Sequence, residues 1–179
     1  MRTAITPKNI LCLLITLALA MLAACTPQPP EPMSVVPAKR QIAWHQMEQY
    51  AFVHFTINTF TDKEWGYGDE SPEWFAPSDF DADHLVRVVG DAGLRGLILT
   101  AKHHDGFCLW PSKYNKDYSM AAVPGKYRNF DIVRATEKAC RKYGLEFGAY
   151  LSPWDRYRAD YARPSYVDYF HNQWDELMT

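Results

Sequence analysis

The sequence predicts an α/β fold that is built on a parallel sheet. Strand-like and helix-like segments alternate along it, in the order 50–56, 81–92, 97–101, 131–143, 145–151 and a last helix after Pro164. Because a helix separates each strand from the next, neighbouring strands are expected to be parallel. A (β/α) barrel and an open doubly wound sheet both satisfy this order. No glycine-rich phosphate loop follows any strand, which weakens a nucleotide-binding version of the open sheet.

The strands and their flanking helices are predicted from periodicity and from end signals. A short amphipathic helix is expected over 40–49, before a first strand at 50–56 that is rich in aromatic and β-branched residues. Helix 81–92 follows the N-cap candidates Ser78, Asp79 and Asp81 and stops at Gly93. Its inward stripe is predicted to be Leu85, Val86, Val88 and Val89.

The two later helices also show an apolar face at helical spacing. In helix 131–143 this face holds Ile132, Val133, Thr136, Ala139, Cys140 and Tyr143, and Gly144 ends the helix. In the helix after Pro164 it holds Tyr166, Val167, Phe170, Trp174 and Leu177. Each face is expected to pack on the sheet.

The central strand carries the most informative residues of the chain. A buried apolar run, Leu97–Leu99, leads directly into Lys102, His103, His104 and Asp105. Four proton-carrying side chains at the end of a buried strand are costly to keep dry without partners. In parallel α/β folds the carboxyl ends of the strands are where active sites are built. We therefore expect a functional site at this end of the sheet.

Two long loops, 58–77 and 111–129, are expected to border the same site, because loops of this length inside a compact domain tend to be functional. The first loop contains Glu64 and Trp65. The chain has 11 Tyr, 9 Phe and 6 Trp, many of them in loops. Exposed aromatic faces suit carbohydrate, since the apolar face of a pyranose stacks on a ring, although core packing accounts for part of this content.

The N-terminal residues read as an export signal and not as part of the fold. Arg2 and Lys8 precede an apolar run at 10–22, which ends in Leu22-Ala-Ala-Cys25. Small residues before a cysteine resemble the bacterial lipobox, so residues 1–25 are expected to be a lipoprotein signal peptide with Cys25 lipidated. An ordinary secretory signal is the alternative. The predicted product is an exported, membrane-anchored lipoprotein of the periplasm or the cell surface.

The remaining composition divides the chain and limits its partners. Five prolines in the twelve residues Thr26–Pro37 predict an extended linker over 26–38, which leaves 39–179 as the domain. The net charge of −2 gives no indication of a nucleic-acid partner. Cys108 and Cys140 remain in the domain, either joined as a disulfide or as two buried thiols, and no metal-type cysteine spacing is present.

Three stretches of the domain, 54–66, 99–114 and 145–156, resemble the α-L-fucosidases of glycoside hydrolase family 29. The pieces Asn-Thr-Phe-Thr and Ser-Pro-Trp-Asp-Arg are similar to the subgroup that prefers α-1,3/1,4-linked fucose on branched glycans. The resemblance covers about Arg40 to Met178. It implies a (β/α)8-like barrel, with about three βα units present here, followed in the family by a β-sandwich.

The resemblance also implies a substrate and a set of binding residues. A terminal α-L-fucose of an oligosaccharide or glycoconjugate would be released by a retaining mechanism without a cofactor. The residues implied to bind it are His54, Glu64, Trp65, His103 and His104, with Tyr150 near the end of the third strand and Trp154 on the aglycone side. Neutral imidazole both donates and accepts hydrogen bonds, and carboxylate accepts them strongly, which suits a sugar bearing several hydroxyls.

The sequence departs from the family pattern in one respect. Retaining glycosidases need two carboxyl groups about 5–5.5 Å apart. In the family the nucleophile follows the fourth strand and the acid/base lies further on, so we expect this sequence to be an N-terminal part that lacks both. Glu64, Asp105 and Asp155 are carboxylates of the right type, but the resemblance assigns none of them that role.

Two other functions stay open. One is a metal-dependent barrel hydrolase with His54, His103, His104 and Asp105 as ligands. The other is a non-catalytic surface protein that binds glycans.

Overall fold

The computed structural model describes residues 7–8, 14–16, 29–31, 33 and 35–179. The predicted lipidation site, Cys25, lies outside the described residues. The chain divides into two units, 1–41 and 42–179, and the second is the folded domain. Helix α2 (Lys39–Met47) confirms the helix predicted at 40–49. Within the described part of the chain, no helix combines the length and apolar character needed to cross a membrane.

The domain is built on a three-stranded parallel sheet, as the alternation of strands and helices predicted. Its order is β1 (Ala51–Val53), β2 (Gly96–Lys102), β3 (Glu146–Leu151), so β2 is central. Leu97 pairs with Ala51 on one side and with Phe147 on the other. Six of the seven residues of β2 are buried, so side chains on both faces of this strand are covered, in agreement with its continuous apolar run.

The first strand is shorter than the predicted 50–56. Its pairing ends at Val53, and the chain turns at Thr56 into a short 3₁₀ helix, η1 (Ile57–Phe60). The Thr56 side chain accepts from the Asn58 amide, and the Thr59 side chain accepts from the Thr56 amide. This reciprocal capping favours a turn over extended backbone, and it leaves His54 just beyond the strand end.

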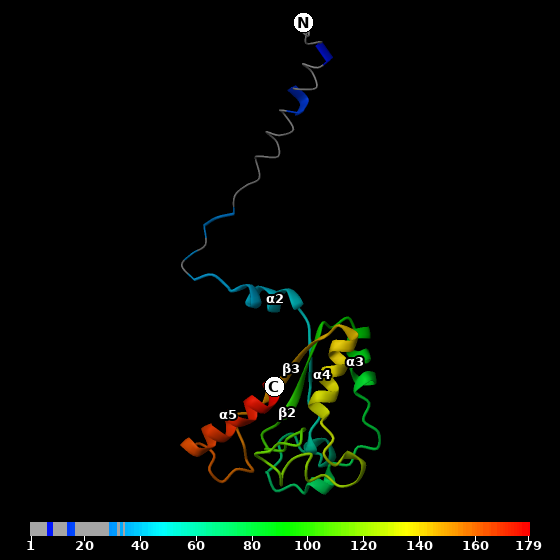
Figure 1. Ribbon diagram of the computed structural model, residues 1–179, viewed down its shortest axis with the longest axis vertical. Helices are drawn as coiled ribbons and strands as arrows, with labels where there is room; N and C mark the ends of the chain where they lie inside the picture. Colours follow the sequence, from blue (N-terminus) through cyan, green and yellow to red (C-terminus); the bar gives the residue numbers. More distant parts are fainter. Residues whose placement is uncertain (1–6, 9–13, 17–28, 32, 34) are drawn as a thin grey trace. The chain divides into compact units, whose positions relative to one another are not determined.

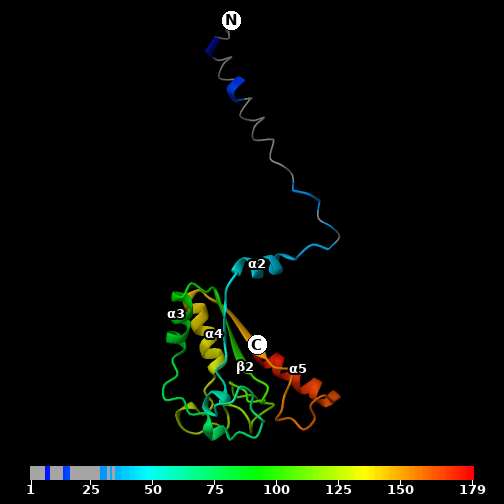
Figure 2. The same ribbon diagram turned by 180° about the vertical axis from the view of Figure 1, so that it is seen from behind.

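The helices that follow the strands pack against one hydrophobic core. Helices α3 (Ala82–Asp91) and α4 (Ile132–Tyr143) lie side by side, and the C-terminal end of α5 (Pro164–Met178) lies beside α4, where residues of both helices line one pocket (Figures 1 and 2). Asp81 and Asp131 cap α3 and α4 through their carboxylates, as side chains of this type do at helix N-termini. Gly144 ends α4 in the left-handed conformation, with φ 72°.

Two of the predicted inward faces were partly wrong. In α3 the buried residues are Val86 and Val89, whereas Val88 is 52% exposed. In α5 the predicted Val167 and Trp174 are 49% and 37% exposed, and the buried residues are Tyr166, Tyr169 and Gln173. The polar residues face inward in α5 because they surround the buried ammonium group of Lys102, which an apolar face would leave without partners.

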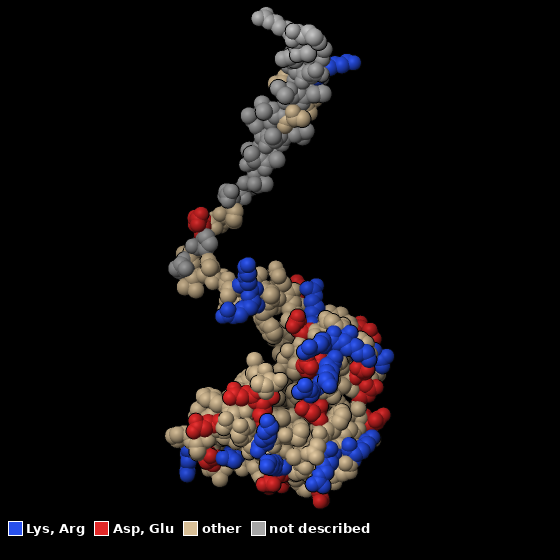
Figure 3. Space-filling model, in the orientation of Figure 1, with Lys and Arg blue, Asp and Glu red and all other residues tan. Residues whose placement is uncertain are grey.

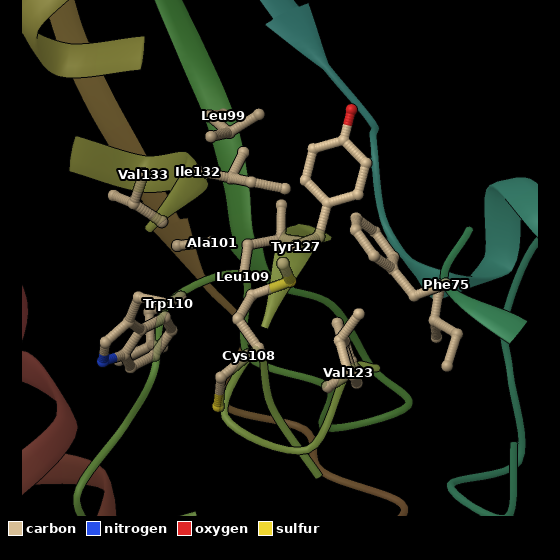
Figure 4. Close-up of a cluster of buried hydrophobic side chains, with 14 of the residues drawn as sticks. Phe75, Leu99, Ala101, Cys108, Leu109, Trp110, Val123, Tyr127, Ile132 and Val133 are labelled. Carbon is tan, nitrogen blue, oxygen red and sulfur yellow. The ribbon is translucent and has the colours of Figure 1, made fainter. Parts of the chain in front are cut away.

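The hydrophobic core lies between the central strand, α4 and the loops that follow β2. Leu99 and Ala101 of β2 meet Ile132 and Val133 of α4, and loop residues that include Phe75 and Leu109 close the core (Figure 4). Cys108 and Cys140 are both buried and both free, so of the two arrangements left open by the sequence the structure has separate thiols. The core thus holds the loops that carry the candidate site.

Candidate functional site

The carboxyl ends of the strands bring the predicted site residues to one place. His54 follows β1, His103 and His104 follow β2, and Trp154 follows β3. The rings of His103 and His104 lie 4.3 Å apart, and that of His54 lies 5.3 Å from His103. Three residues from two parts of the chain therefore form one imidazole cluster at the end of the sheet.

A polar cavity of about 200 Å³ adjoins this cluster. Its lining residues are His54, Thr56, Asn58, Thr59, Lys63, Glu64 and His103. The Glu64 carboxylate makes no hydrogen bond or ion pair to any group in the described part of the chain, whereas His103 is 5% exposed. The cavity therefore offers an unengaged carboxylate and a buried imidazole side by side.

Aromatic rings border the other side of the cluster. The Trp65 ring lies 5.6 Å from His104 and 5.5 Å from Trp154, and His104 lies 5.0 Å from Trp154. Tyr150, at the end of β3, lies 6.5 Å from both His103 and His104. All seven residues predicted from the sequence are thus brought together around the imidazole cluster.

Two of these histidines, His103 and His104, are held in their neutral form. Desolvation, followed by the neighbouring imidazoles of His104 and His54, lowers the pKa of His103 to about 4. Desolvation, His54 and Arg156 also lower the pKa of His104 below its usual 6.5. Near pH 7 each ring therefore keeps one donor and one acceptor, the combination that sugar hydroxyls need.

The loop that carries Glu64 and Trp65 is fixed by two buried carboxylates. Glu70 accepts from the Tyr67 and Gly68 amides, from Lys63 and from the Tyr118 hydroxyl. Burial alone would raise the pKa of Glu70, but these donors outweigh it and hold the pKa at about 2. Gly66 packs so closely that a Cβ there would lie 2.5 Å from Asn58 Oδ1 and 2.8 Å from Asp105 Cβ. The close approach positions Glu64 and Trp65 over the strand end.

Asp105 is the second of these carboxylates. It is fully buried and accepts from the Asn58 side chain at 2.8 Å and from the Phe107 amide at 2.7 Å. Its two oxygens are therefore engaged within the protein and turned to structural donors. Asp105 supports the loop and does not face a ligand.

The stability of the domain should depend on the charge of Asp105. Burial raises the pKa of Asp105 from 3.8 to about 6, so the folded chain holds more protons than the unfolded chain between these values. Stability from this group therefore falls as the pH rises through that window, by at most about 3 kcal/mol. Asp105→Asn should remove the dependence. Urea denaturation of both proteins below pH 3.8 and above pH 6 measures it, and a difference between them that does not change with pH would refute the assignment.

A buried ion pair ties the histidine segment to the loop after β3. Lys102 Nζ donates to Asp155 Oδ2 at 3.0 Å, to Gln173 Oε1 at 2.9 Å and to the Tyr166 hydroxyl at 3.3 Å. The side chains of Lys102 and Asp155 are both inaccessible to solvent. The loop fixed in this way carries Ser152 and Trp154, and both of these residues contact His104.

The residues proposed for a metal are not arranged as a set of ligands. Among the residues that the structure describes, no three His, Cys, Asp or Glu side chains are placed to hold a metal ion. His103 Nδ1 is enclosed and has no partner among these residues, and Asp105 is turned to Asn58 and Phe107. The geometry therefore gives no support to the set His54, His103, His104 and Asp105.

Comparison with known protein families identifies the chain. Residues 32–179 match the family model described as alpha-L-fucosidase. The chain belongs to the α-L-fucosidase family. Alpha-L-fucosidase 1 of Arabidopsis thaliana is 40% identical over 151 residues, which are 84% of this chain and 30% of that protein. The chain spans about 30% of the length of the curated fucosidases that it matches.

Solved structures of fucosidases share the fold. A glycoside hydrolase 29 family member from a rumen bacterium superposes with a TM-score of 0.80 at 52% identity, over 83% of this chain and 27% of that one. A Ruminococcus gnavus GH29 fucosidase in complex with fucose superposes with a TM-score of 0.74 at 37% identity, over 84% of this chain and 34% of that one. A Bacteroides thetaiotaomicron α-L-fucosidase was trapped as a covalent intermediate with 2-fluoro-fucosyl fluoride. It superposes with a TM-score of 0.66 at 26% identity, over 82% of this chain and 40% of that one.

Several residues that shape the candidate site were not predicted from the sequence. Asn58, Glu70 and Ser152 position the binding residues through hydrogen bonds that span between 2 and 48 positions of the chain. Lys102 was recognised as a polar residue at a strand end, but not as half of a buried ion pair. The sequence gives one indication of this pair, because Lys102 and Asp155 both lie beside apolar segments. A charged residue that is buried with such a segment needs a partner of opposite charge.

Proposed function

We propose that this chain supplies the fucose-binding part of a retaining exo-α-L-fucosidase. The observation that carries the proposal is the assembly of His54, Glu64 and His103 around one polar cavity, with the imidazole of His104 beside it. These groups match a deoxyhexose, whose hydroxyls both donate and accept while its C6 methyl group is apolar. Trp65 and Trp154 offer the aromatic faces for that methyl group and for the aglycone.

The reaction requires two further carboxyl groups, which we place beyond residue 179 in the complete protein. Asp105 and Asp155 are buried and engaged with Asn58 and Lys102, so neither reaches the cavity. Glu64 alone does not provide the pair about 5–5.5 Å apart that retention needs. The chain spans about 30% of its curated relatives, and the trapped covalent intermediate of the Bacteroides thetaiotaomicron enzyme supports a nucleophilic mechanism. The three βα units would then begin a (β/α)8-like barrel.

The substrate class is a terminal α-L-fucose on an oligosaccharide or glycoconjugate, with α-1,3/1,4 branches preferred. The branch preference is supported by the loop residues 58–61 and 152–156, which resemble that subgroup. In this arrangement Trp154 lies 5.5 Å from Trp65, so the two rings would form one continuous aromatic surface that reaches from the fucose to the sugar that carries it.

Hydrolysis of fucosides by the complete protein tests the function. We expect release of fucose with retention, faster from α-1,3/1,4-branched glycans than from aryl fucosides, and no turnover by residues 1–179 alone. Loss of activity with a chelator would favour the metal-dependent hydrolase. Fucose binding without turnover would favour the glycan-binding protein, and turnover by the 179-residue chain would contradict our placement of the catalytic pair.

We also propose that the protein is an exported lipoprotein held at a membrane through Cys25. The support is the basic start, the apolar run at 10–22 and the Leu-Ala-Ala-Cys25 sequence. Mass spectrometry of the exported protein should find an acylated cysteine at the mature N-terminus. An unmodified N-terminus at another residue would show an ordinary secretory signal.

A further inference from the structure

The hydrogen bonds of Ser152 determine where the neutral His104 ring carries its proton. Ser152 Oγ lies 2.7 Å from the Trp154 carbonyl oxygen and 2.8 Å from His104 Nδ1, and the residue is fully buried. A carbonyl oxygen only accepts hydrogen bonds, so the single hydroxyl proton of Ser152 is directed to Trp154. The contact with His104 must then use a proton on Nδ1. Because a neutral imidazole has one ring proton, Nε2 of His104 carries a lone pair.

His103 is under the opposite constraint. Its Nδ1 is enclosed and has no hydrogen-bond partner within the described residues. Enclosing an N–H group without a partner is rarer in proteins than enclosing an acceptor without one, so the proton is expected on Nε2. Nε2 is not enclosed in this way, and His103 lines the polar cavity. His103 therefore offers the cavity a donor.

We propose that His103 and His104 hold opposite tautomers, which place an N–H donor beside a bare-nitrogen acceptor, and that Ser152 is the positioning residue that sets this arrangement. The centroids of the two rings are 4.3 Å apart, so both rings are close enough to contact one sugar ring. One hydroxyl donates to His104 Nε2 and the next accepts from His103 Nε2–H. The identity of the ligand rests on the proposed function, whereas the tautomers follow from the protein alone.

Opposite tautomers select a ligand by the direction of its hydrogen bonds as well as by the positions of its hydroxyls. With identical tautomers, both rings would present donors or both would present acceptors. In vicinal hydroxyls of a sugar, one hydroxyl can donate to the next, which leaves one of the two free to accept and the other free to donate. Such a pair matches a donor beside an acceptor better than it matches two donors or two acceptors. The Arg156 amide donates to the His104 carbonyl oxygen at 2.8 Å, which fixes the segment around Ser152 and keeps the geometry in place.

Nitrogen NMR of the complete protein without sugar tests the proposal directly. In a ¹⁵N-labelled sample at neutral pH, His104 should show a protonated Nδ1 and a bare Nε2, and His103 should show the reverse. A bare Nδ1 on His104, or the same tautomer on both rings, would overturn the proposal. This measurement needs no substituted protein, so it does not depend on whether a variant folds.

Ser152→Ala tests the positioning role. Without the acceptor at Nδ1, the His104 proton should shift to Nε2, and the affinity for fucose should fall about tenfold, the loss expected for one hydrogen bond. Ser152→Thr, which keeps the hydroxyl, should restore both the NMR signature and the affinity. Ser119→Ala is the matched control, because Ser119 is also buried but its hydroxyl accepts from the Ala121 amide and bonds neither histidine.

The outcomes separate this inference from the proposed function. Opposite tautomers in a protein that does not bind fucose would reject the fucosidase and keep the assignment of the two rings. Fucose binding with a bare His104 Nδ1 would reject the assignment and keep the fucosidase. A Ser152→Ala protein that folds with an unchanged His104 tautomer would reject the role of Ser152.

Discussion

Lys102→Met is expected to lower the free energy of unfolding by about 3–5 kcal/mol, the cost of breaking a buried ion pair on one side only. The substitution keeps most of the side-chain volume but leaves the Asp155 carboxylate uncompensated at zero exposure. It also removes the donor to Gln173 and Tyr166. Chemical denaturation of the complete protein measures the loss.

Two further variants determine whether the buried charge is the cause. Lys142→Met removes the lysine of an exposed pair with Asp83, and there we expect a loss below about 1 kcal/mol. The double variant Lys102→Met with Asp155→Asn should recover a substantial part of the stability, because no isolated charge stays buried. A Lys102→Met protein as stable as Lys142→Met, or a double variant no better than the single one, would contradict this account.

The parts of the fold that the sequence predicted are those fixed by local signals. Alternating apolar segments, Asp81 and Asp131 as caps and Gly144 as a stop located the helices within about two residues. The continuous apolar run in β2 indicated a strand buried on both faces. These signals depend on residues close in sequence, so a single chain displays them.

The parts that were missed depend on contacts between distant residues. The predicted inward face of α5 was partly wrong because apolar spacing was followed, whereas Lys102, 64 positions before Tyr166, requires polar partners there. The strand at 50–56 was too long because the capping of η1 outweighs the β propensity of Phe55 and Thr56. The support of the site by Glu70 and Ser152 also had no periodic signal.

The mixed charge of the surface agrees with the expected partners. Lysine and arginine side chains are interspersed with aspartate and glutamate over the visible face of the domain (Figure 3). A face of mixed charge does not attract a polyanion by charge alone. Ligand recognition therefore depends on the shape and the hydrogen bonds of the candidate site. The binding residues are accordingly where the largest effects on activity are expected.

Glu64→Gln in the complete enzyme is expected to lower kcat/KM about ten- to hundredfold. The Glu64 carboxylate lines the cavity and makes no hydrogen bond or ion pair in the described part of the chain, so its capacity as an acceptor is free for a sugar hydroxyl. A hydrogen bond to a charged group contributes about 1.5–3 kcal/mol, and about 1.4 kcal/mol corresponds to one decade in rate. Because hydroxyl contacts tighten as the sugar ring flattens, kcat should fall along with kcat/KM.

The controls for this prediction use a second glutamate and the folding equilibrium. Glu73 is exposed in η2 (Pro72–Trp74) and does not line the cavity, so Glu73→Gln should leave the kinetics unchanged. Glu64 is exposed and has no polar partner among the described residues, so Glu64→Gln should alter the unfolding free energy by less than about 0.5 kcal/mol. A loss of activity without a loss of stability would show that Glu64 binds the ligand and does not stabilise the fold. A Glu64→Gln enzyme with unchanged kcat/KM would remove Glu64 from the site. Loss of wild-type activity on treatment with a chelator would instead show that catalysis depends on a metal. The proposed binding of sugar hydroxyls by Glu64 and the imidazole cluster requires no metal.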